Sequence, residues 1–334
     1  MTKPAFNNVK RRAWIYQPEP LPSPKALMGS KKQRKAFFDY WLRKAPFDAL
    51  DILAFLGFSL LPSKLTSRIG AELGQRLMPR LYKTQTKRAT ETIRRLRPDL
   101  SPSNQDALLL ANQRAQGSVL TEFSVITRLK KDPSPVHLYG MEKIQKAHAK
   151  GPVIIIGMHI SNWELGAYLF PNAGMTPHIN YVPPKERGKS WISTLIRKKG
   201  GVVFLPPGFE GIRPAINALK DGGLVSVFCD EGFEGKIRGP FFDCEPHLNG
   251  NLGYVARLAR MSGATLCPWY CRRTGDFKFE FYALDPINLP EGPKTPQQIW
   301  DDVALLNSVI EPVILANLDQ WYFLDNRLGP KKKP

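Results

Sequence analysis

The stretch Val153-Ile-Ile-Ile-Gly-Met-His159-Ile-Ser-Asn-Trp-Glu164-Leu-Gly166 decides both the fold and the site that we predict for this chain. Its apolar run predicts a strand, and a histidine and a carboxylate follow, five residues apart. Residues with this spacing lie far from each other around one helix, because each residue turns the helix by about 100°. His159 and Glu164 can therefore meet only if the histidine lies in the turn after the strand and the glutamate lies in the first helical turn.

A histidine and a glutamate placed in this way can carry out acid–base chemistry. The Glu164 carboxylate would accept a hydrogen bond from one imidazole nitrogen of His159, which fixes the tautomer and leaves the other nitrogen free as a base. The ordinary alternative for a histidine near a strand end is a structural role. The combined pattern of strand, glycine and His-x4-Glu favours catalysis here. The other four histidines have no comparable setting and are interpreted as structural or solvated: His137, His148, His178 and His247.

Short apolar runs and helical segments alternate in the second half of the chain. Strands are predicted at 153–156, 178–182, 202–205, 224–228, 265–270 and 277–284, and helices at 162–170, 188–199, 211–220 and 249–261. The alternation predicts an α/β core with a mixed, mostly parallel sheet flanked by helices. In such a core, ligands collect beyond the carboxyl ends of the strands. Asp230 follows one predicted strand as His159 follows another, so we expect both to face the same crevice.

The regions before and after this core are predicted to differ from it. Residues 1–30 contain five prolines and are expected to be irregular. Residues 31–131 are predicted to form a basic helical region. Its helices are expected near 31–44, 47–61, 65–95 (with a possible break at Pro79) and 103–128. Residues 132–328 form the predicted α/β core, and residues 329–334 form a basic tail.

The net charge of +19 is distributed unevenly. Residues 1–131 hold 25 Lys and Arg against 9 Asp and Glu, a net charge of +16. Nucleic acid, an anionic lipid surface and an acidic protein are the three kinds of partner that such a region can attract. In residues 31–44 the basic side chains are interleaved with four aromatic ones, which fits a membrane surface. No nucleic-acid-binding motif is present, so a nucleic-acid partner is not expected.

The most apolar stretch of the chain is Ile52–Leu61, which has ten residues. A helix needs about 20 residues to span a bilayer, so this stretch is interpreted as a buried, interfacial or re-entrant helix. The polar, proline-rich N-terminus lacks the apolar segment of a secretory signal. We therefore expect the protein on the cytoplasmic side of a membrane, bound to it peripherally or monotopically.

The four cysteines do not indicate a disulfide framework. The pair Cys267-x3-Cys271 has a spacing that zinc can use, but no second Cys/His pair follows, so no metal is expected. A covalent acyl-cysteine at Cys229 is supported only by its position next to Asp230.

The segment around His159 resembles the lipid A biosynthesis acyltransferases, which add secondary acyl chains to lipopolysaccharide precursors. The pattern of that family is a strand followed by His-x4-Asp/Glu, often with Asn-Trp-Glu inside it. Further similar motifs occur in the family's order, and together they cover roughly residues 45–328. They are Tyr181-Val-Pro-Pro-Lys185, Arg197-Lys-Lys-Gly200, the strand ending in Asp230-Glu231, Gly239-Pro-Phe-Phe-Asp243, Leu258–Pro268 and Gln320-Trp-Tyr-Phe-Leu-Asp-Asn-Arg327.

Some positions depart from the family pattern. Glu231 stands where glutamine is usual, Asp243 where glycine is usual, and Val182 where arginine is usual. The segment Glu245–Asn251 replaces a threonine-rich stretch. These changes lie around the expected substrate groove, so they affect the identity of the acceptor more than the chemistry of acyl transfer.

The resemblance implies transfer of a fatty acyl chain from an acidic acyl carrier protein to a hydroxyl of a lipid A precursor, without a cofactor or metal. His159 would take the proton from the hydroxyl, with Glu164 orienting it and stabilising the imidazolium. Arg197, or backbone N–H groups after His159, would stabilise the oxyanion. Other expected roles are substrate binding by Asn162, substrate positioning or organisation of Arg197 by Asp230, and either an acyl groove or core packing for Phe241 and Phe242.

Three alternatives remain open at this point. The same chemistry could act on another membrane acceptor, such as a glycolipid, an aminolipid or a polyene pigment, or it could use acyl-CoA as the donor. Glycerol-phosphate acyltransferases share a His-x4-Asp core, but their Phe-Pro-Glu-Gly motif is missing from this chain. The nearest string is Pro207-Gly-Phe-Glu-Gly211, which has a different order. A membrane-surface binding protein with an inactive core is a third alternative, against which the intact His159 and Glu164 argue.

Overall fold

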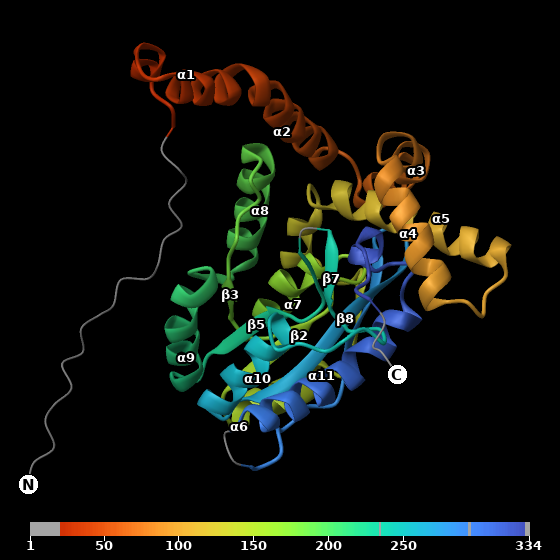
Figure 1. The fold of residues 1–334 in the computed structure, drawn as a ribbon, viewed down its shortest axis with the longest axis vertical. Helices are drawn as coiled ribbons and strands as arrows, with labels where there is room; N and C mark the ends of the chain where they lie inside the picture. The colour runs from red at the N-terminus through yellow and green to blue at the C-terminus, as the bar shows by residue number, and fades with distance from the viewer. Residues whose placement is uncertain (1–20, 234, 293–294, 331–334) are drawn as a thin grey trace, which may run out of the picture.

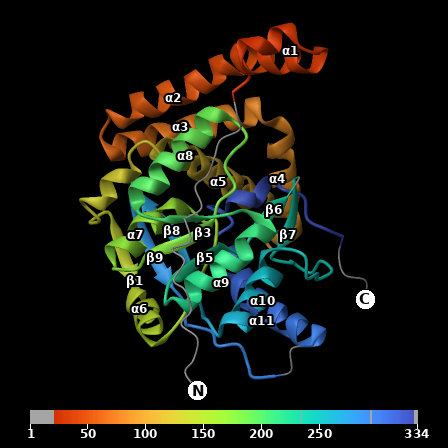
Figure 2. The same cartoon turned by 90° about the vertical axis from the view of Figure 1, so that its left-hand side faces the viewer.

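The computed structural model describes residues 21–233, 235–292 and 295–330. A seven-stranded sheet crosses the middle of this structure, and helices cover both of its faces (Figures 1 and 2). The strand order is β1-β9-β8-β2-β5-β3-β4. All neighbours pair in parallel except β8 and β9, which form an antiparallel hairpin. The predicted mixed, mostly parallel sheet is therefore confirmed.

The strands of this sheet are short apart from β8. They are β1 (Val136–Tyr139), β2 (Val153–Gly157), β3 (Pro177–Asn180), β4 (Val203–Leu205), β5 (Leu224–Phe228), β8 (Thr265–Gly275) and β9 (Lys278–Ala283). A separate two-stranded antiparallel sheet follows β5 directly and consists of β6 (Glu231–Phe233) and β7 (Lys236–Gly239).

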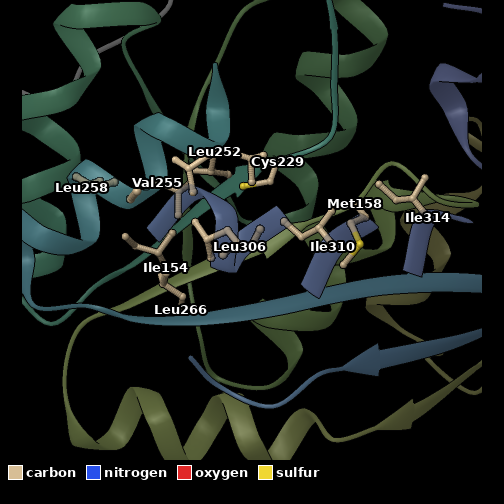
Figure 3. Close-up of a cluster of buried hydrophobic side chains, with 14 of the residues drawn as sticks. Ile154, Met158, Cys229, Leu252, Val255, Leu258, Leu266, Leu306, Ile310 and Ile314 are labelled. Atoms are coloured by element: carbon tan, nitrogen blue, oxygen red, sulfur yellow. The ribbon is translucent and has the colours of Figure 1, made fainter. Parts of the chain in front are cut away.

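Strand β2 lies near the centre of the sheet, and its side chains are buried on both faces because helices cover each face. On one face Ile154 and Ile156 belong to a cluster with α9 (Ile212–Lys220), α10 (Asn251–Ser262) and α11 (Pro296–Ala316), part of which Figure 3 shows. On the other face Val153 and Ile155 belong to a cluster with α6 (Met141–Lys150) and α7 (Gly166–Asn172). Burying each such side chain stabilises the fold by about 1.5–3 kcal/mol, so the turn after β2 starts from a rigid strand.

The N-terminal part of the described chain is helical, as predicted. It begins with a short 3-10 helix (Pro24–Met28) inside the segment that was expected to be irregular. The longer elements are α1 (Lys31–Phe38), a π-helical segment (Asp39–Lys44), α2 (Ala45–Ser59), α3 (Ser63–Leu81), α4 (Lys83–Leu96) and α5 (Pro102–Glu122), followed by a 3-10 turn (Ile126–Lys130). The expected break at Pro79 occurs at Tyr82 instead, because the proline is accommodated in the last turn of α3. The predictions for residues 1–20 and 331–334 lie outside the described residues.

Helices α3 and α5 cross at a contact made by glycines. A Cβ atom added to Gly117 would lie 2.1 Å from the carbonyl oxygen of Gly70 and 2.7 Å from the Cα atom of Gly74. Because these neighbours are backbone atoms, the contact can accommodate a side chain only if the helices separate. The backbones of α3 and α5 are therefore in direct contact at this crossing.

We expect Gly117→Ala to lower the free energy of unfolding by about 1–3 kcal/mol, because the added methyl group overpacks the crossing. Chemical denaturation monitored by circular dichroism measures the change. Gly57→Ala in α2 is the control, since nothing lies within 4 Å of its added Cβ, and it should raise stability by about 0.5–1 kcal/mol. Equal stability of the Gly117→Ala variant and the wild type would contradict the packing that the structure shows.

Several elements have no counterpart among the predictions from sequence. They are β1, α6, the β6–β7 hairpin and the long helix α11. No helix in the described residues has both the length and the hydrophobicity needed to cross a membrane.

Candidate active site

The site lies at the carboxyl ends of the neighbouring strands β2 and β5. Gly157, the last residue of β2, is level with Phe228, the last residue of β5, and the Cys229 N–H donates to the Gly157 carbonyl at 3.1 Å. His159 and Asp230 each follow two residues after their strand. The matched strand ends therefore bring the two side chains together, as the sequence predicted.

The carboxylate of Asp230 holds the imidazole of His159. His159 Nδ1 lies 3.0 Å from Asp230 Oδ1 and 3.2 Å from the Asp230 carbonyl oxygen. Both of these oxygens can only accept, so Nδ1 must carry the proton. The neutral ring then keeps its lone pair on Nε2, which none of the described residues engages in a hydrogen bond. His159 is thus set up as a base.

The surroundings of this pair are largely apolar. Asp230 is fully buried, and the side chain of His159 is 19% exposed. The ring centroid of Phe228 lies 4.2 Å from that of His159, and those of Trp163 and Phe323 each lie 5.1 Å away. Low polarity strengthens the interaction between Asp230 and a protonated His159, so the imidazolium would be stabilised where it forms.

Glu164 has a different partner from the one that the sequence predicted. It lies in a 3-10 turn (Trp163–Leu165) and accepts a bidentate interaction from Arg197 of α8 (Arg187–Gly200), with Nε 3.0 Å from Oε2. Ser161, at φ 55°, turns the chain between His159 and Glu164, so that the carboxylate meets α8 rather than the imidazole. The His159–carboxylate hydrogen bond is made by Asp230.

Arg197 lies where the sequence predicted a cation. Its side chain lines the same cavity as His159 and is 25% exposed. Glu164 occupies Nε and Nη2, so Nη1 is left without a hydrogen-bond partner in the described part of the chain. Asp230 does not organise Arg197, as one interpretation of the sequence had it, because its carboxylate accepts hydrogen bonds from His159 and from Trp321.

Asn162 does not face substrate. It is fully buried and donates through Nδ2 to Oε2 of Glu122 at 2.9 Å. Arg273 on β8 binds the same carboxylate with both Nη atoms, one of them at 2.7 Å. Asn162 therefore fixes the turn after His159 to α5 and β8, which corrects the predicted substrate-binding role.

Phe241 and Phe242 belong to the core and not to the cavity. Both are buried in the cluster beneath α11, and their backbone N–H groups donate to Asn307 and Glu311 of that helix. The ring of Phe242 packs edge-on against Trp321, at 5.5 Å between centroids. The core-packing alternative therefore describes Phe242, whereas Phe241 is buried in the same cluster and also lines a separate pocket of about 390 Å³, so its acyl-groove role stays a prediction.

A cavity of about 610 Å³ extends from His159 between the sheet and the helices α7, α8 and α9. This volume is typical of a small-molecule site. Most of its lining is apolar and includes Trp163, Ala167, Phe170, Ile179, Ile212, Val227, Phe228 and Trp269. Glu164, Arg197 and Glu231 add polar groups. The arrangement suits a hydrocarbon chain whose reactive end lies at the histidine.

Glu231, one of the departures from the family pattern, lines this cavity together with His159. Its Oε1 accepts from the Asn251 N–H at the start of α10, at 3.2 Å. Burial raises the pKa of the Glu231 carboxyl above its usual value. The side chain is placed to interact with whatever enters beside His159.

The thiol of Cys229 is unsuited to covalent catalysis. Its side chain is buried, and this burial raises its pKa well above the usual value, so the thiol stays protonated at neutral pH. Within residues 21–233, 235–292 and 295–330, no group of three or more His, Cys, Asp or Glu side chains is arranged to hold a metal ion.

Sequence reasoning gave no individual role to Trp321, Glu122 or Arg273. Trp321 lies in the motif Gln320-Trp-Tyr-Phe that carried part of the resemblance, so a signal was present at the level of the motif. Glu122 and Arg273 belong to no motif, and only the fold brings them to Asn162.

A histidine held by a carboxylate beside an apolar cavity is compatible with acyl transfer, and comparison with known proteins gives the class as acyltransferase. The chain belongs to the bacterial lipid A biosynthesis acyltransferase family, whose sequence profile matches residues 39–329. It is 26% identical over 274 residues to the lipid A biosynthesis lauroyltransferase of Escherichia coli (strain K12), covering 80% of this chain and 86% of that protein. The family that the motifs suggested is thereby confirmed.

Among solved structures, the 1-acyl-sn-glycerophosphate (LPA) acyltransferase PlsC from Thermotoga maritima aligns with 83% of this chain and 98% of its own. The sequence identity is 15% and the TM-score is 0.34. That score is too low for the likeness to bear on the fold.

Proposed function

We propose that this acyltransferase moves a fatty acyl chain from an acyl carrier protein thioester to a hydroxyl of a lipid A precursor. The observation that carries the proposal is the hydrogen bonding of the His159 ring, which lies at the end of the apolar cavity. Asp230 Oδ1 lies 3.0 Å from His159 Nδ1 and keeps the proton on that nitrogen, so Nε2 is the basic nitrogen. The family match and the lauroyltransferase relative support the choice of acceptor.

In the proposed reaction, Nε2 of His159 removes the proton from the acceptor hydroxyl as its oxygen attacks the thioester carbonyl carbon. Negative charge develops on the carbonyl oxygen. Arg197 Nη1, or backbone N–H groups at the start of the turn Trp163–Leu165, would stabilise it. The C–S bond then breaks, the new ester remains on the acceptor, and the imidazolium returns its proton to the departing thiolate. Asp230 stabilises the imidazolium between these steps.

Glu164 has a supporting role in this proposal. It is almost fully buried, and its bidentate interaction fixes the guanidinium of Arg197 at the cavity wall. A fixed cation stabilises a developing oxyanion better than a mobile one, because no reorganisation is needed when the charge forms.

We propose that α1 and α2 place the enzyme on the cytoplasmic face of the inner membrane. The side of α2 that faces away from α8 carries exposed apolar residues: Phe47, Leu50, Leu53, Leu56 and Leu60. The adjoining helix α1 has three lysines and one arginine. Apolar side chains next to basic ones suit an anionic bilayer surface.

The double variant Leu50→Asp/Leu53→Asp is expected to bind vesicles containing phosphatidylglycerol at least about tenfold more weakly, because two apolar side chains would no longer leave water. Vesicle co-sedimentation measures the binding. Met261→Asp, an exposed site on α10 at the opposite end of the molecule, should bind like the wild type (Figure 1). Unchanged binding by the double variant would rule out this surface.

The function itself is tested by an acyl-transfer assay with the full chain in detergent micelles. Acyl carrier protein thioesters of several lengths, and the matching acyl-CoA thioesters, are supplied with a lipid A precursor that lacks secondary acyl chains. Mass spectrometry then detects the acylated product. Product from the carrier-protein thioester supports the proposal. Thioester hydrolysis that depends on His159 but gives no acylated lipid A precursor would leave the chemistry in place and overturn the acceptor.

A further inference from the structure

A segment near the C-terminal end of the described residues, around Trp321, pairs with the turn that bears His159. Ile160 and Trp321 form an antiparallel bridge. Two hydrogen bonds flank it, from Ser161 N–H to the Gln320 carbonyl and from Tyr322 N–H to the His159 carbonyl, each 2.9 Å. The backbone that follows the His159 Cα atom, from the His159 carbonyl to the Ser161 N–H, is thus held by residues about 160 positions later in the chain.

The indole of Trp321 reaches from this bridge to Asp230. Trp321 Nε1 donates to Asp230 Oδ2 at 2.8 Å, and the His159 N–H donates to the same oxygen at 2.7 Å. Oδ1 is then left for His159 Nδ1. Both carboxylate oxygens are fixed by N–H donors, and Trp321 is the donor that comes from outside the two strand ends. Hydrogen bonds to a buried, ionised carboxylate are strong, because water cannot replace them.

The position of Trp321 is itself fixed from two directions. Its carbonyl oxygen accepts from Asn112 Nδ2 at 2.8 Å and from Gln116 Nε2 at 3.2 Å, both on α5. Its ring is fully buried against Phe242. An indole held at both its backbone and its ring can act as a rigid support for a carboxylate.

We propose that Trp321 is a positioning residue for the catalytic base: its indole N–H fixes the rotation of the Asp230 carboxylate, which in turn fixes the tautomer and direction of His159. The proposal rests on the proposed function in that His159 is the base. It does not depend on which acceptor is used. Trp321 touches neither substrate nor the reacting atoms, so its effect is transmitted through Asp230.

The test replaces the N–H of Trp321 and keeps its ring. Trp321→Phe is compared with a tryptophan isostere at the same position in which sulfur replaces the indole N–H, so that folding is preserved if the smaller ring is not tolerated. We expect kcat to fall by about tenfold to a hundredfold, the scale of a small misplacement of a catalytic group. KM should stay within about twofold, because ground-state binding is untouched. Trp300→Phe, at an exposed tryptophan of α11 outside the site, is the control and should keep the wild-type kcat.

A double-mutant cycle separates positioning from general support of the fold. In an Asp230→Ala background, loss of the Trp321 N–H should have little further effect on kcat, because the group through which it acts is gone. If the two effects multiply instead, or if the sulfur isostere keeps the wild-type kcat, Trp321 is structural and the proposal is wrong.

Two further measurements test the role of Trp321 even if the proposed function is wrong. If the wild type does not acylate the lipid A precursor, the same comparisons are made on hydrolysis of the acyl thioester, which needs the same base. The exchange-protected Nδ1–H resonance of His159 in proton–nitrogen spectra needs no activity. It should shift or broaden in the Trp321 variants and stay unchanged in Trp300→Phe. An unchanged resonance in the Trp321 variants would overturn the proposal.

Discussion

Substituting alanine for His159 is expected to lower kcat for acyl transfer by about 10²–10⁴-fold, the contribution typical of a general base. The reason is that, among the described residues that line the cavity, His159 is the one imidazole, and the guanidinium of Arg197 stays protonated. Steady-state kinetics with the carrier-protein thioester measure the change, and circular dichroism checks the fold. The side chain lines the cavity and is partly exposed, so its removal should leave the core intact.

His137→Ala provides the matched control. His137 is an exposed residue of the edge strand β1, far from the strand ends that form the site, and its replacement should leave kcat unchanged. If His159→Ala kept more than about a tenth of the wild-type kcat, the base would have to be sought elsewhere.

Asp230→Asn is expected to lower kcat by about 10²–10⁴-fold, nearly as much as loss of His159 itself. An asparagine can turn its NH₂ group toward Nδ1, which would then accept a hydrogen bond and leave the proton on Nε2. The imidazole would be present in the wrong tautomer and could not take a proton from the acceptor. The asparagine keeps the size of the aspartate, so the effect is on protonation more than on packing.

Glu164→Gln is the informative counterpart of Asp230→Asn. It removes the charge that fixes Arg197 but leaves the Asp230–His159 hydrogen bond in place, so a smaller loss of about tenfold is expected. Parallel measurement of kcat for the two variants decides which carboxylate serves the histidine. A larger loss in Glu164→Gln than in Asp230→Asn would restore the assignment made from sequence spacing.

The sequence predicted the elements that place His159 because their signals are local. A buried parallel strand such as β2 is a continuous apolar run, and the alternation of such runs with helical segments requires an α/β core. The meeting of His159 with Asp230 could also be predicted, since carboxyl ends of neighbouring parallel strands share one edge of a sheet. β1 was missed because it is a four-residue strand with one buried residue.

The partner of each side chain could not be predicted, because it depends on segments that are remote in sequence. Nearness along the chain suggested Glu164 for His159, yet the left-handed Ser161 turns the intervening backbone and α8 supplies a better partner for the glutamate. Asn162 lies beside the base in sequence, but it binds Glu122 in α5. The direction of a side chain out of a turn is set by what packs around that turn.

The bridge between Ile160 and Trp321 also has a consequence for the order in which the protein matures. About 160 residues separate the base from the segment that supports it, and synthesis at about 5–20 residues per second needs roughly 8–30 s to add them. After β8 has been added, the strands that line the cavity have all been synthesised, but the turn bearing His159 still lacks its bridge to Trp321. The nascent chain is therefore expected to form the cavity for a fatty chain before it can cleave a thioester in that cavity. Competence for catalysis would then begin only after Trp321 has been added and has paired with this turn.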